Sequence, residues 1–392
     1  MRIQGEQVQH SWYRWSVLFT SLFAFMAFAF AFQVGPPLLK SVKAEFSIES
    51  DAQAALLMSI VLVPGVFLSL PAGVAVRKYG TFRVGLASLI CVVAGSFVTA
   101  VADSFVILLS GRLILGIGGT FIFIGTPAII AQWFAREELG KAMGIYGVNM
   151  PLSTVIAFPV ASLLMDAYGW RFPFYVCSGV AISAAIVFAV TIKEGPLSER
   201  KAAVNVRRAF RSFEIWKLGF VWLFFQAAAL SFTTWAPTLF ERFKDVLGVQ
   251  ASVYASLLSW AAIFCVPFFG YMSDRTGRRK LFAVIGLLLM SLAFVVLAFT
   301  FDLALVIFII GLGVAAAMTP PIVSSLPPEI LGQNLASVGF GITTMCANVG
   351  ATLAQPLIGS VLDFTQSYVA CLLGMAAISA AGALAAYTLK TR

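Results

Sequence analysis

Residues 105–134 read FVILLSGRLILGIGGTFIFIGTPAIIAQWF, a stretch of thirty residues in which Arg112 is the one ionisable side chain. At ~1.5 Å per residue, a helix of this length exceeds the ~30 Å hydrocarbon core of a bilayer. The stretch therefore predicts a helix that spans a membrane.

Eleven further apolar blocks of similar length flank this one, and several are separated by only a few residues. Short connections between long helices indicate antiparallel neighbours, so the chain is expected to cross the membrane twelve times. The first block stays apolar over residues 17–39, which is too long for the core of a signal peptide. The expected blocks are 15–39, 54–76, 82–102, 105–134, 140–165, 172–192, 215–239, 251–273, 281–301, 303–326, 335–361 and 368–389.

The composition agrees with an all-α integral membrane protein. Hydrophobic residues make up 60% of the 392 residues and charged residues 11%, against about 25% charged residues in soluble domains. The net charge of +9 does not indicate a nucleic-acid partner, because the charges lie in short loops between the apolar blocks. The partner expected for these surfaces is the lipid bilayer.

The basic residues predict the orientation. With the N-terminus in the cytoplasm, 20 of the 26 Lys and Arg residues fall on the cytoplasmic side and five on the other, with Arg112 inside a helix. This bias places both termini inside a cell membrane, and an inner membrane is expected. The longest polar stretch is a charged linker over residues 193–214, which divides an N-terminal half (1–192) from a C-terminal half (215–392) of six helices each.

Cysteine and histidine usage indicates neither a metal site nor an enzyme. All five cysteines lie inside apolar blocks without a CxxC spacing, and the single histidine, His10, lies in the polar N-terminal tail. No nucleophile–base pair stands out either. We therefore expect no cofactor and no catalytic activity.

The two halves are related by an internal repeat with an offset of 197 residues. Several glycine, proline and aspartate residues recur at this offset, from the second to the fifth helix of each half. The matched pairs are Gly73 and Gly270, Gly80 and Gly277, Gly116 and Gly313, Gly144 and Gly341, Pro159 and Pro356, and Asp166 and Asp363. Duplicated six-helix units often place a substrate site between the halves, near the middle of the bilayer.

One copy of the repeat carries a recognisable loop. Residues 270–280 read GYMSDRTGRRK, which resembles the loop signature of the major facilitator superfamily (MFS), and Arg112 followed by spaced glycines resembles another of its motifs. The resemblance implies alternating access and a path lined by the first, fourth, seventh and tenth helices. It also implies a cytoplasmic latch with a partner near Lys141, whereas the first-half copy has Arg77 at the acid position. The latch residues are Gly270, Asp274, Arg275, Gly277 and Arg278.

The charges inside the bilayer suggest the class of substrate. Arg112 is the one ionisable residue expected near the middle of the membrane, and no Asp or Glu lies deep in any helix. A cation site would need a buried carboxylate, whereas the planar fork of an arginine binds anions. Arg112 either attracts a small monovalent anion or braces neighbouring helices by bonding backbone carbonyls.

Uncharged polar and aromatic residues are the other candidates for substrate contact, although contacts between helices are the favoured explanation for each of them. These candidates are Gln33, Tyr146, Asn149, Gln226, Trp260, Thr319 and Asn348.

The sequence thus predicts an MFS secondary transporter, expected to be monomeric, for a small organic or inorganic anion. The resemblance is nearest to the cyanate, nitrate/nitrite or monocarboxylate permeases. Coupling to a proton or to a counter-anion stays open. The alternatives are efflux of a neutral or amphipathic compound, and a receptor that kept the fold without transport.

Overall fold

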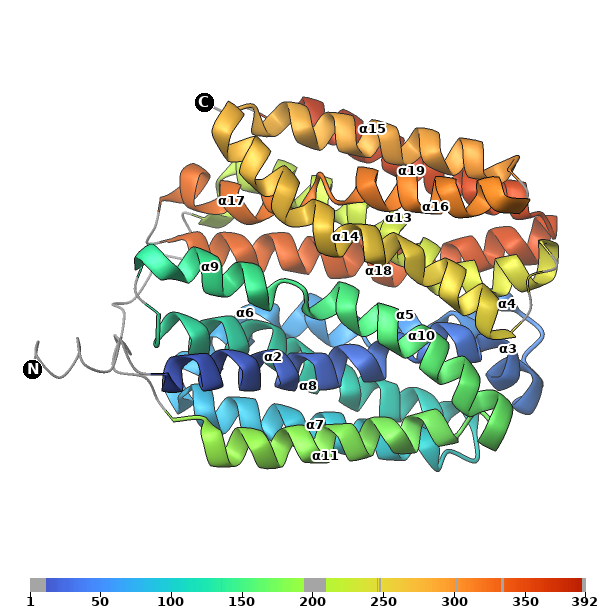
Figure 1. The fold of residues 1–392 in the computed structure, drawn as a ribbon, viewed down its shortest axis with the longest axis horizontal. Helices are drawn as coiled ribbons and strands as arrows, with labels where there is room; N and C mark the ends of the chain where they lie inside the picture. Colours follow the sequence, from blue (N-terminus) through green and yellow to red (C-terminus); the bar gives the residue numbers. More distant parts are fainter. Residues whose placement is uncertain are drawn as a thin grey trace, which may run out of the picture.

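The computed structural model describes residues 12–134, 136–193, 209–244, 246, 248–300, 302–332 and 335–389. Twelve helices in this part of the chain are long and apolar enough to cross a membrane. They lie side by side along one direction, and the described chain begins and ends at the same end of the molecule (Figure 1). We call this the near end, and the opposite end, where α3 and α4 lie, the far end.

The first six spanning segments are built from ten helices. Breaks divide the first, second and fifth segments, while the others are single helices. These helices are α2 (Tyr13–Gln33), α3 (Gly35–Glu45), α4 (Asp51–Ala54), α5 (Leu56–Ser59), α6 (Val63–Tyr79), α7 (Thr81–Ala100), α8 (Phe105–Ala131), α9 (Arg136–Tyr146), α10 (Asn149–Tyr168) and α11 (Phe172–Thr191).

The second six spanning segments contain one broken segment, the tenth. Their helices are α13 (Phe213–Phe243), α14 (Gly248–Thr276), α15 (Arg279–Ala298), α16 (Asp302–Ala316), α17 (Pro320–Leu331), α18 (Ala336–Thr365) and α19 (Tyr368–Tyr387). The expected linker over 193–214 lies mostly outside the described residues.

The breaks explain the two largest errors in the expected boundaries. The first block was expected to end at residue 39, but α3 continues it to Glu45 after a break at Val34. The tenth was expected to end at residue 326, but α17 continues to Leu331. Both α3 and α17 have a pair of prolines in the first turn, where the N–H that proline lacks is not needed. The sequence pattern located the prolines, but it did not show that a new helix starts at them.

The repeat of 197 residues is visible in the backbone. Gly80 and Gly277 both have positive φ, at 85° and 65°, and each follows the last residue of a helix. Gly169 and Gln366, also 197 apart, have positive φ of 85° and 46° at the ends of α10 and α18. Matching positions therefore end matching helices in the same way.

The repeat also appears in one close contact between helices. A Cβ atom on Gly116 of α8 would overlap the backbone carbonyl of Val61. A Cβ on Gly313 of α16 would overlap the carbonyl of Leu258. Both the glycines and their partners are 197 residues apart, so the same crossing is built twice.

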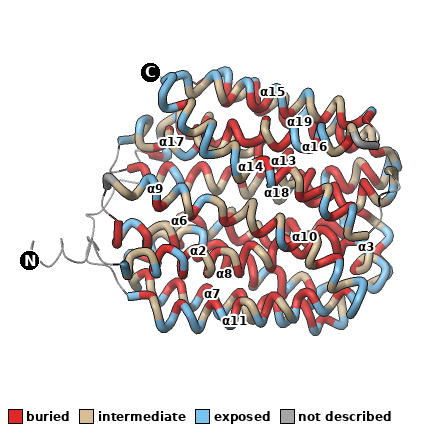
Figure 2. The backbone as a smooth tube through the Cα atoms, in the orientation of Figure 1, coloured by how far each residue is buried: buried red, intermediate tan, exposed pale blue. Residues whose placement is uncertain are grey.

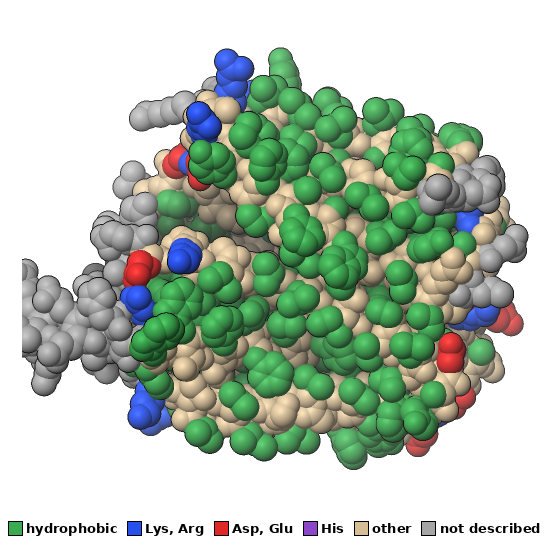
Figure 3. Space-filling view, viewed as in Figure 1, with side chains coloured by type: hydrophobic (Ala, Val, Ile, Leu, Met, Phe, Trp, Pro, Cys, Tyr) green, Lys and Arg blue, Asp and Glu red, His purple; other side chains and the backbone are tan. Residues whose placement is uncertain are grey.

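The buried apolar residues form two clusters. One draws on residues 17–192, and the other on residues 209–389 together with Ala55 and Phe158 from the first half. Buried stretches run along helix sides that face other helices (Figure 2). The face in Figure 3 is mostly apolar, and its charged side chains gather at the two ends, as expected for a protein surrounded by lipid.

We predict that Gly116→Ala lowers the thermal stability of the purified protein strongly, because the added methyl group meets backbone that cannot move aside. Overpacking of this kind typically costs about 1–3 kcal/mol. Gly179→Ala in α11 is the matched control, because a Cβ there meets no atom within 4 Å. Equal melting temperatures for the two variants would contradict this description of the crossing.

Candidate functional site

Arg112 is completely buried in the N-terminal half, and its guanidinium group is bonded to backbone carbonyls. Nε donates to the carbonyl of Leu57 at 2.8 Å, and the two terminal nitrogens donate to those of Ala31 at 2.8 Å and Phe32 at 3.2 Å. The group also lies 5.8 Å from the ring centroid of Phe174. Arg112 therefore joins α8 to the end of α2 and to α5.

The break between α2 and α3 accounts for part of this arrangement. Pro36 has no N–H and cannot donate to the carbonyl of Phe32, four residues earlier. Arg112 donates to this carbonyl instead. An open carbonyl in the membrane interior is costly. The contacts of Arg112 thus favour the bracing interpretation, while anion binding by its guanidinium stays a prediction.

Gln33 lies at the same break. Its side-chain amide nitrogen donates to the Thr154 hydroxyl on α10, and Thr154 in turn donates to the carbonyl of Met150 at 3.1 Å. The Gln33 side-chain oxygen is buried and has no hydrogen-bond partner in the structure. The side-chain oxygen of Gln33 therefore accepts no hydrogen bond, and its amide nitrogen donates only to the Thr154 hydroxyl.

An accessible strip on α2 leads to Gln33. Its residues recur at helical spacing and are partly or fully exposed, although α2 packs on α7, α8, α10 and α11 of its own half. Phe19, near the start of the helix, is 55% exposed. The strip consists of Ser16, Phe19, Phe23, Met26 and Phe30. The strip ends one turn before Gln33, which is buried.

Gln226 on α13 is the corresponding candidate from the C-terminal half. It is half-buried, and Leu230, one turn further along α13, packs against the core of the N-terminal half. Residues four apart share a helix face, so Gln226 also faces the N-terminal half.

Two of the other predicted residues make contacts inside or between helices. The Tyr146 hydroxyl pairs with that of Thr126 and its ring lies 5.8 Å from that of Phe25, all within the N-terminal half. Asn149, at the break between α9 and α10, accepts from the Met150 N–H. Neither residue has a described contact with the accessible strip on α2.

The remaining three have no described contact with Gln33. The Thr319 hydroxyl oxygen lies 3.3 Å from where a Cβ on Gly286 would stand, so it faces α15. Trp260 is 46% exposed, on the same side of α14 as the exposed Phe264 and Phe268. The Asn348 amide donates to the carbonyl of Thr344 at 3.0 Å and lies against Gly65 of α6, where the two halves touch.

The predicted latch takes a different form from the one expected. Gly277, at φ 65°, follows the end of α14, and Asp274 pairs with Arg279 at 2.8 Å. Arg279 also pairs with Glu329 on α17, so the described ion pairs of this loop stay within the C-terminal half. The other latch positions are Gly270, whose Cβ would lie 3.5 Å from Pro321, and the exposed Arg275 and Arg278.

The contact expected between Asp274 and the region near Lys141 is not among the described contacts of this conformation, so that latch stays a prediction. Lys141 lies 5.9 Å from the ring centroid of Trp15 in its own half. The helix that carries it, α9, packs on α2 and α8, whereas α10 of the same segment packs on α14 across the two halves. On the face shown in Figure 3, the surface is hollowed between α9 and the side formed by α14 and α17.

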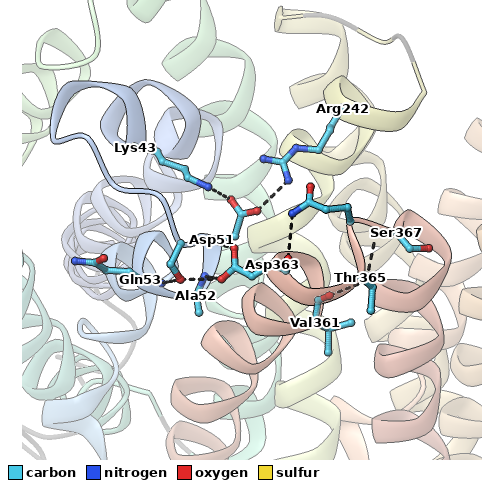
Figure 4. A network of polar contacts seen from close by, with 11 residues as sticks. Lys43, Asp51, Ala52, Gln53, Arg242, Val361, Asp363, Thr365 and Ser367 are labelled. Atoms are coloured by element: carbon cyan, nitrogen blue, oxygen red, sulfur yellow. Dashed lines mark hydrogen bonds and ion pairs between the residues drawn. The ribbon is translucent and has the colours of Figure 1, made fainter.

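At the far end the halves are joined by a polar seam that the sequence analysis did not identify (Figure 4). The Asp363 carboxylate, on α18, accepts from the backbone N–H groups of Asp51 at 2.6 Å and Ala52 at 3.0 Å. The Asp51 carboxylate pairs with Lys43 at 2.6 Å and with Arg242 of α13 at 2.9 Å. The recurrence of Asp166 and Asp363 at the repeat offset was the one signal that pointed here.

Comparison with known proteins agrees with this architecture. The family model described as Major Facilitator Superfamily matches residues 17–354 and 244–392. In overall structure the chain is similar to a bacterial homolog of the human lysosomal transporter Spinster, in an inward-facing and occupied conformation. The TM-score is 0.80 at 16% identity, over 97% of this chain and 98% of that one.

Among curated proteins, the chain is similar to the inner membrane transport protein RhmT of Escherichia coli, with 24% identity over 87% of this chain and 86% of the relative. It is also similar to a probable nitrate/nitrite antiporter, NarK1, of Thermus thermophilus, with 25% identity over 88% and 84%. A putative tartrate transporter of Agrobacterium vitis is 22% identical over 66% of each chain. The twelve-helix fold and the match of the family model along the chain show that this protein belongs to the Major Facilitator Superfamily and is a membrane transporter rather than an enzyme.

Proposed function

We propose that this transporter carries a small organic or inorganic anion across the membrane by alternating access. The observation that carries the proposal is the buried positive charge of Arg112, which forms no ion pair with a carboxylate in the described part of the chain. The nitrate/nitrite and tartrate transporters among its relatives support the same class of substrate.

Arg112 does not touch the anion, but its charge attracts the anion to the binding position beside Gln33. Its guanidinium is bonded to the carbonyls of Ala31 and Phe32, immediately before Gln33. A unit charge in a medium of low dielectric constant acts over many ångströms, so the potential beside Gln33 is positive. The amide nitrogen of Gln33, now held by Thr154, would then donate to the anion.

The conformation corresponds to one step of the transport cycle. The seam closes the far end, and the near end is hollowed between the halves (Figure 3). We propose the predicted orientation, with the near end in the cytoplasm of an inner membrane, because the described termini and the basic loop around Arg275 lie there. In that orientation the path is open to the cytoplasm. Exchange against a second anion, or proton symport, would complete the cycle in a monomer.

A second candidate is efflux of an amphipathic compound, and the accessible strip on α2 favours it. Three of its five residues are Phe19, Phe23 and Phe30, and the ring of Phe123 on α8 is 46% exposed. An aromatic wall suits an apolar solute. Phe123→Ala would then reduce transport of a labelled neutral amphipathic dye while leaving anion transport unchanged.

We predict that Arg112→Met lowers the melting temperature of the purified protein strongly, because it leaves three buried carbonyls without their donor. Each orphaned group costs about 1–3 kcal/mol. Arg171→Gln is the matched control, since it removes an arginine that is bonded to Glu45 at 2.7 Å and to the carbonyl of Ala102 at the far end. An Arg112→Met protein as stable as the Arg171→Gln protein would contradict the bracing role.

We predict that Gln33→Leu reduces uptake of nitrate, nitrite, formate or tartrate into proteoliposomes by roughly tenfold, through loss of a hydrogen bond to a charged ligand. The protein should fold normally, because leucine fills a similar volume. Gln250→Leu is the control, since Gln250 bonds the exposed Tyr254 hydroxyl on α14. Unchanged uptake by the Gln33→Leu protein would exclude Gln33 from the binding position.

A further inference from the structure

The seam at the far end holds a carboxylate between two cations from different halves (Figure 4). Asp51 and Lys43 belong to the N-terminal half, whereas Arg242 lies near the end of α13 in the C-terminal half. The Asp51 side chain is only 3% exposed, while that of Arg242 is 34% exposed. The protein thus shows by its own contact that Arg242 binds a carboxylate at this position.

A cavity of about 130 Å³ adjoins this carboxylate. It is roomy enough for several water molecules or one small anion. Three basic and two acidic side chains contribute to its wall, and the residues that line it are Leu39, Lys40, Lys43, Asp51, Ala54, Trp235, Thr238, Glu241 and Arg242. Lys40, whose side chain is 74% exposed, also pairs with Glu241 at 3.6 Å.

The partners of Asp51 cannot all be kept when the far end opens. Lys43 lies eight residues from Asp51 in the same half and can stay with it, whereas Arg242 moves away with the other half. Arg242 then loses its carboxylate. Because its guanidinium presents a planar fork, it would accept a planar oxyanion or a small carboxylate in place of Asp51.

We propose that Arg242 binds a small anion at the far end, in competition with the Asp51 carboxylate, so that anion binding favours opening of this end. An anion that binds the open conformation and is excluded by Asp51 from the closed one shifts the equilibrium toward opening. This site is separate from the one beside Gln33, and shares with the proposed function only the class of ligand.

Opening can be measured at Ala55, which is completely buried and packs in the core of the opposite half. The experiment uses a protein in which the five native cysteines are replaced and Ala55→Cys is introduced. The protein is placed in phosphatidylcholine nanodiscs, and its reaction rate with a membrane-impermeant maleimide is followed. Sodium nitrate is compared with a bulky sulfonate at equal ionic strength, because salt alone weakens ion pairs.

We expect nitrate to raise the labelling rate by roughly fivefold or more over the sulfonate, the lower end of typical coupling between two sites. Arg242→Gln should raise the rate without any anion and remove the nitrate response. Asp51→Asn should also raise the rate, and nitrate should increase its melting temperature more than that of the parent, because the competing carboxylate is gone. Glu45→Gln, which breaks the far-end pair with Arg171 within one half, should leave the nitrate response intact.

Equal labelling in nitrate and sulfonate would overturn the proposal, and so would a nitrate response that survives Arg242→Gln. Nanodiscs with phosphatidylglycerol identify the source of the anion: a response to this lipid with none to nitrate would assign Arg242 to a headgroup and also overturn it. The proposed transport function is tested separately. A protein that takes up no anion can still show the nitrate response, and a protein with normal uptake can lack it.

Discussion

The guanidinium of Arg112 donates hydrogen bonds to backbone carbonyls inside the membrane, where a carbonyl without a donor costs free energy. Pro36 breaks the first spanning segment and leaves the carbonyl of Phe32 open, and Arg112 reaches across from α8 to close it. The same group bonds Leu57 on the broken second segment. Two interrupted helices are thereby held against α8, and a positive charge is fixed beside Gln33. The position of the candidate site depends on this one side chain.

The two ends of the molecule use charge differently. At the far end, Asp363 and Arg242 of the C-terminal half both bond Asp51 or its backbone, so the halves are tied. At the near end, Arg279 forms ion pairs with Asp274 and Glu329, all within the C-terminal half. An alternating transporter needs contacts that form at one end while they are absent at the other. The described ion pairs have this asymmetry. The halves would change orientation when the ion pairs across the far end break and contacts across the near end form.

Much of the fold could be predicted from the sequence, because each apolar block is long enough to cross the hydrocarbon core of a bilayer and the glycines repeat at a fixed offset. The crossing of Gly116 over Val61, and of Gly313 over Leu258, is the physical reason for that repeat. The site was less predictable. Of the candidates predicted from the sequence, Arg112 and Gln33 lie together at the break between α2 and α3, but Thr319 faces α15. The seam around Asp51 joins residues more than 300 positions apart. Such pairings depend on how the halves meet, which no local pattern encodes.

The central claim, that this transporter moves a small anion, is tested most directly by counterflow. Wild-type protein in liposomes loaded with one unlabelled anion is presented with the same labelled anion outside, across a panel of nitrate, nitrite, formate, lactate and tartrate. The account predicts saturable, transient accumulation of at least one of these anions above the level in protein-free liposomes. No accumulation of any anion, together with counterflow of a neutral amphipathic dye, would contradict it.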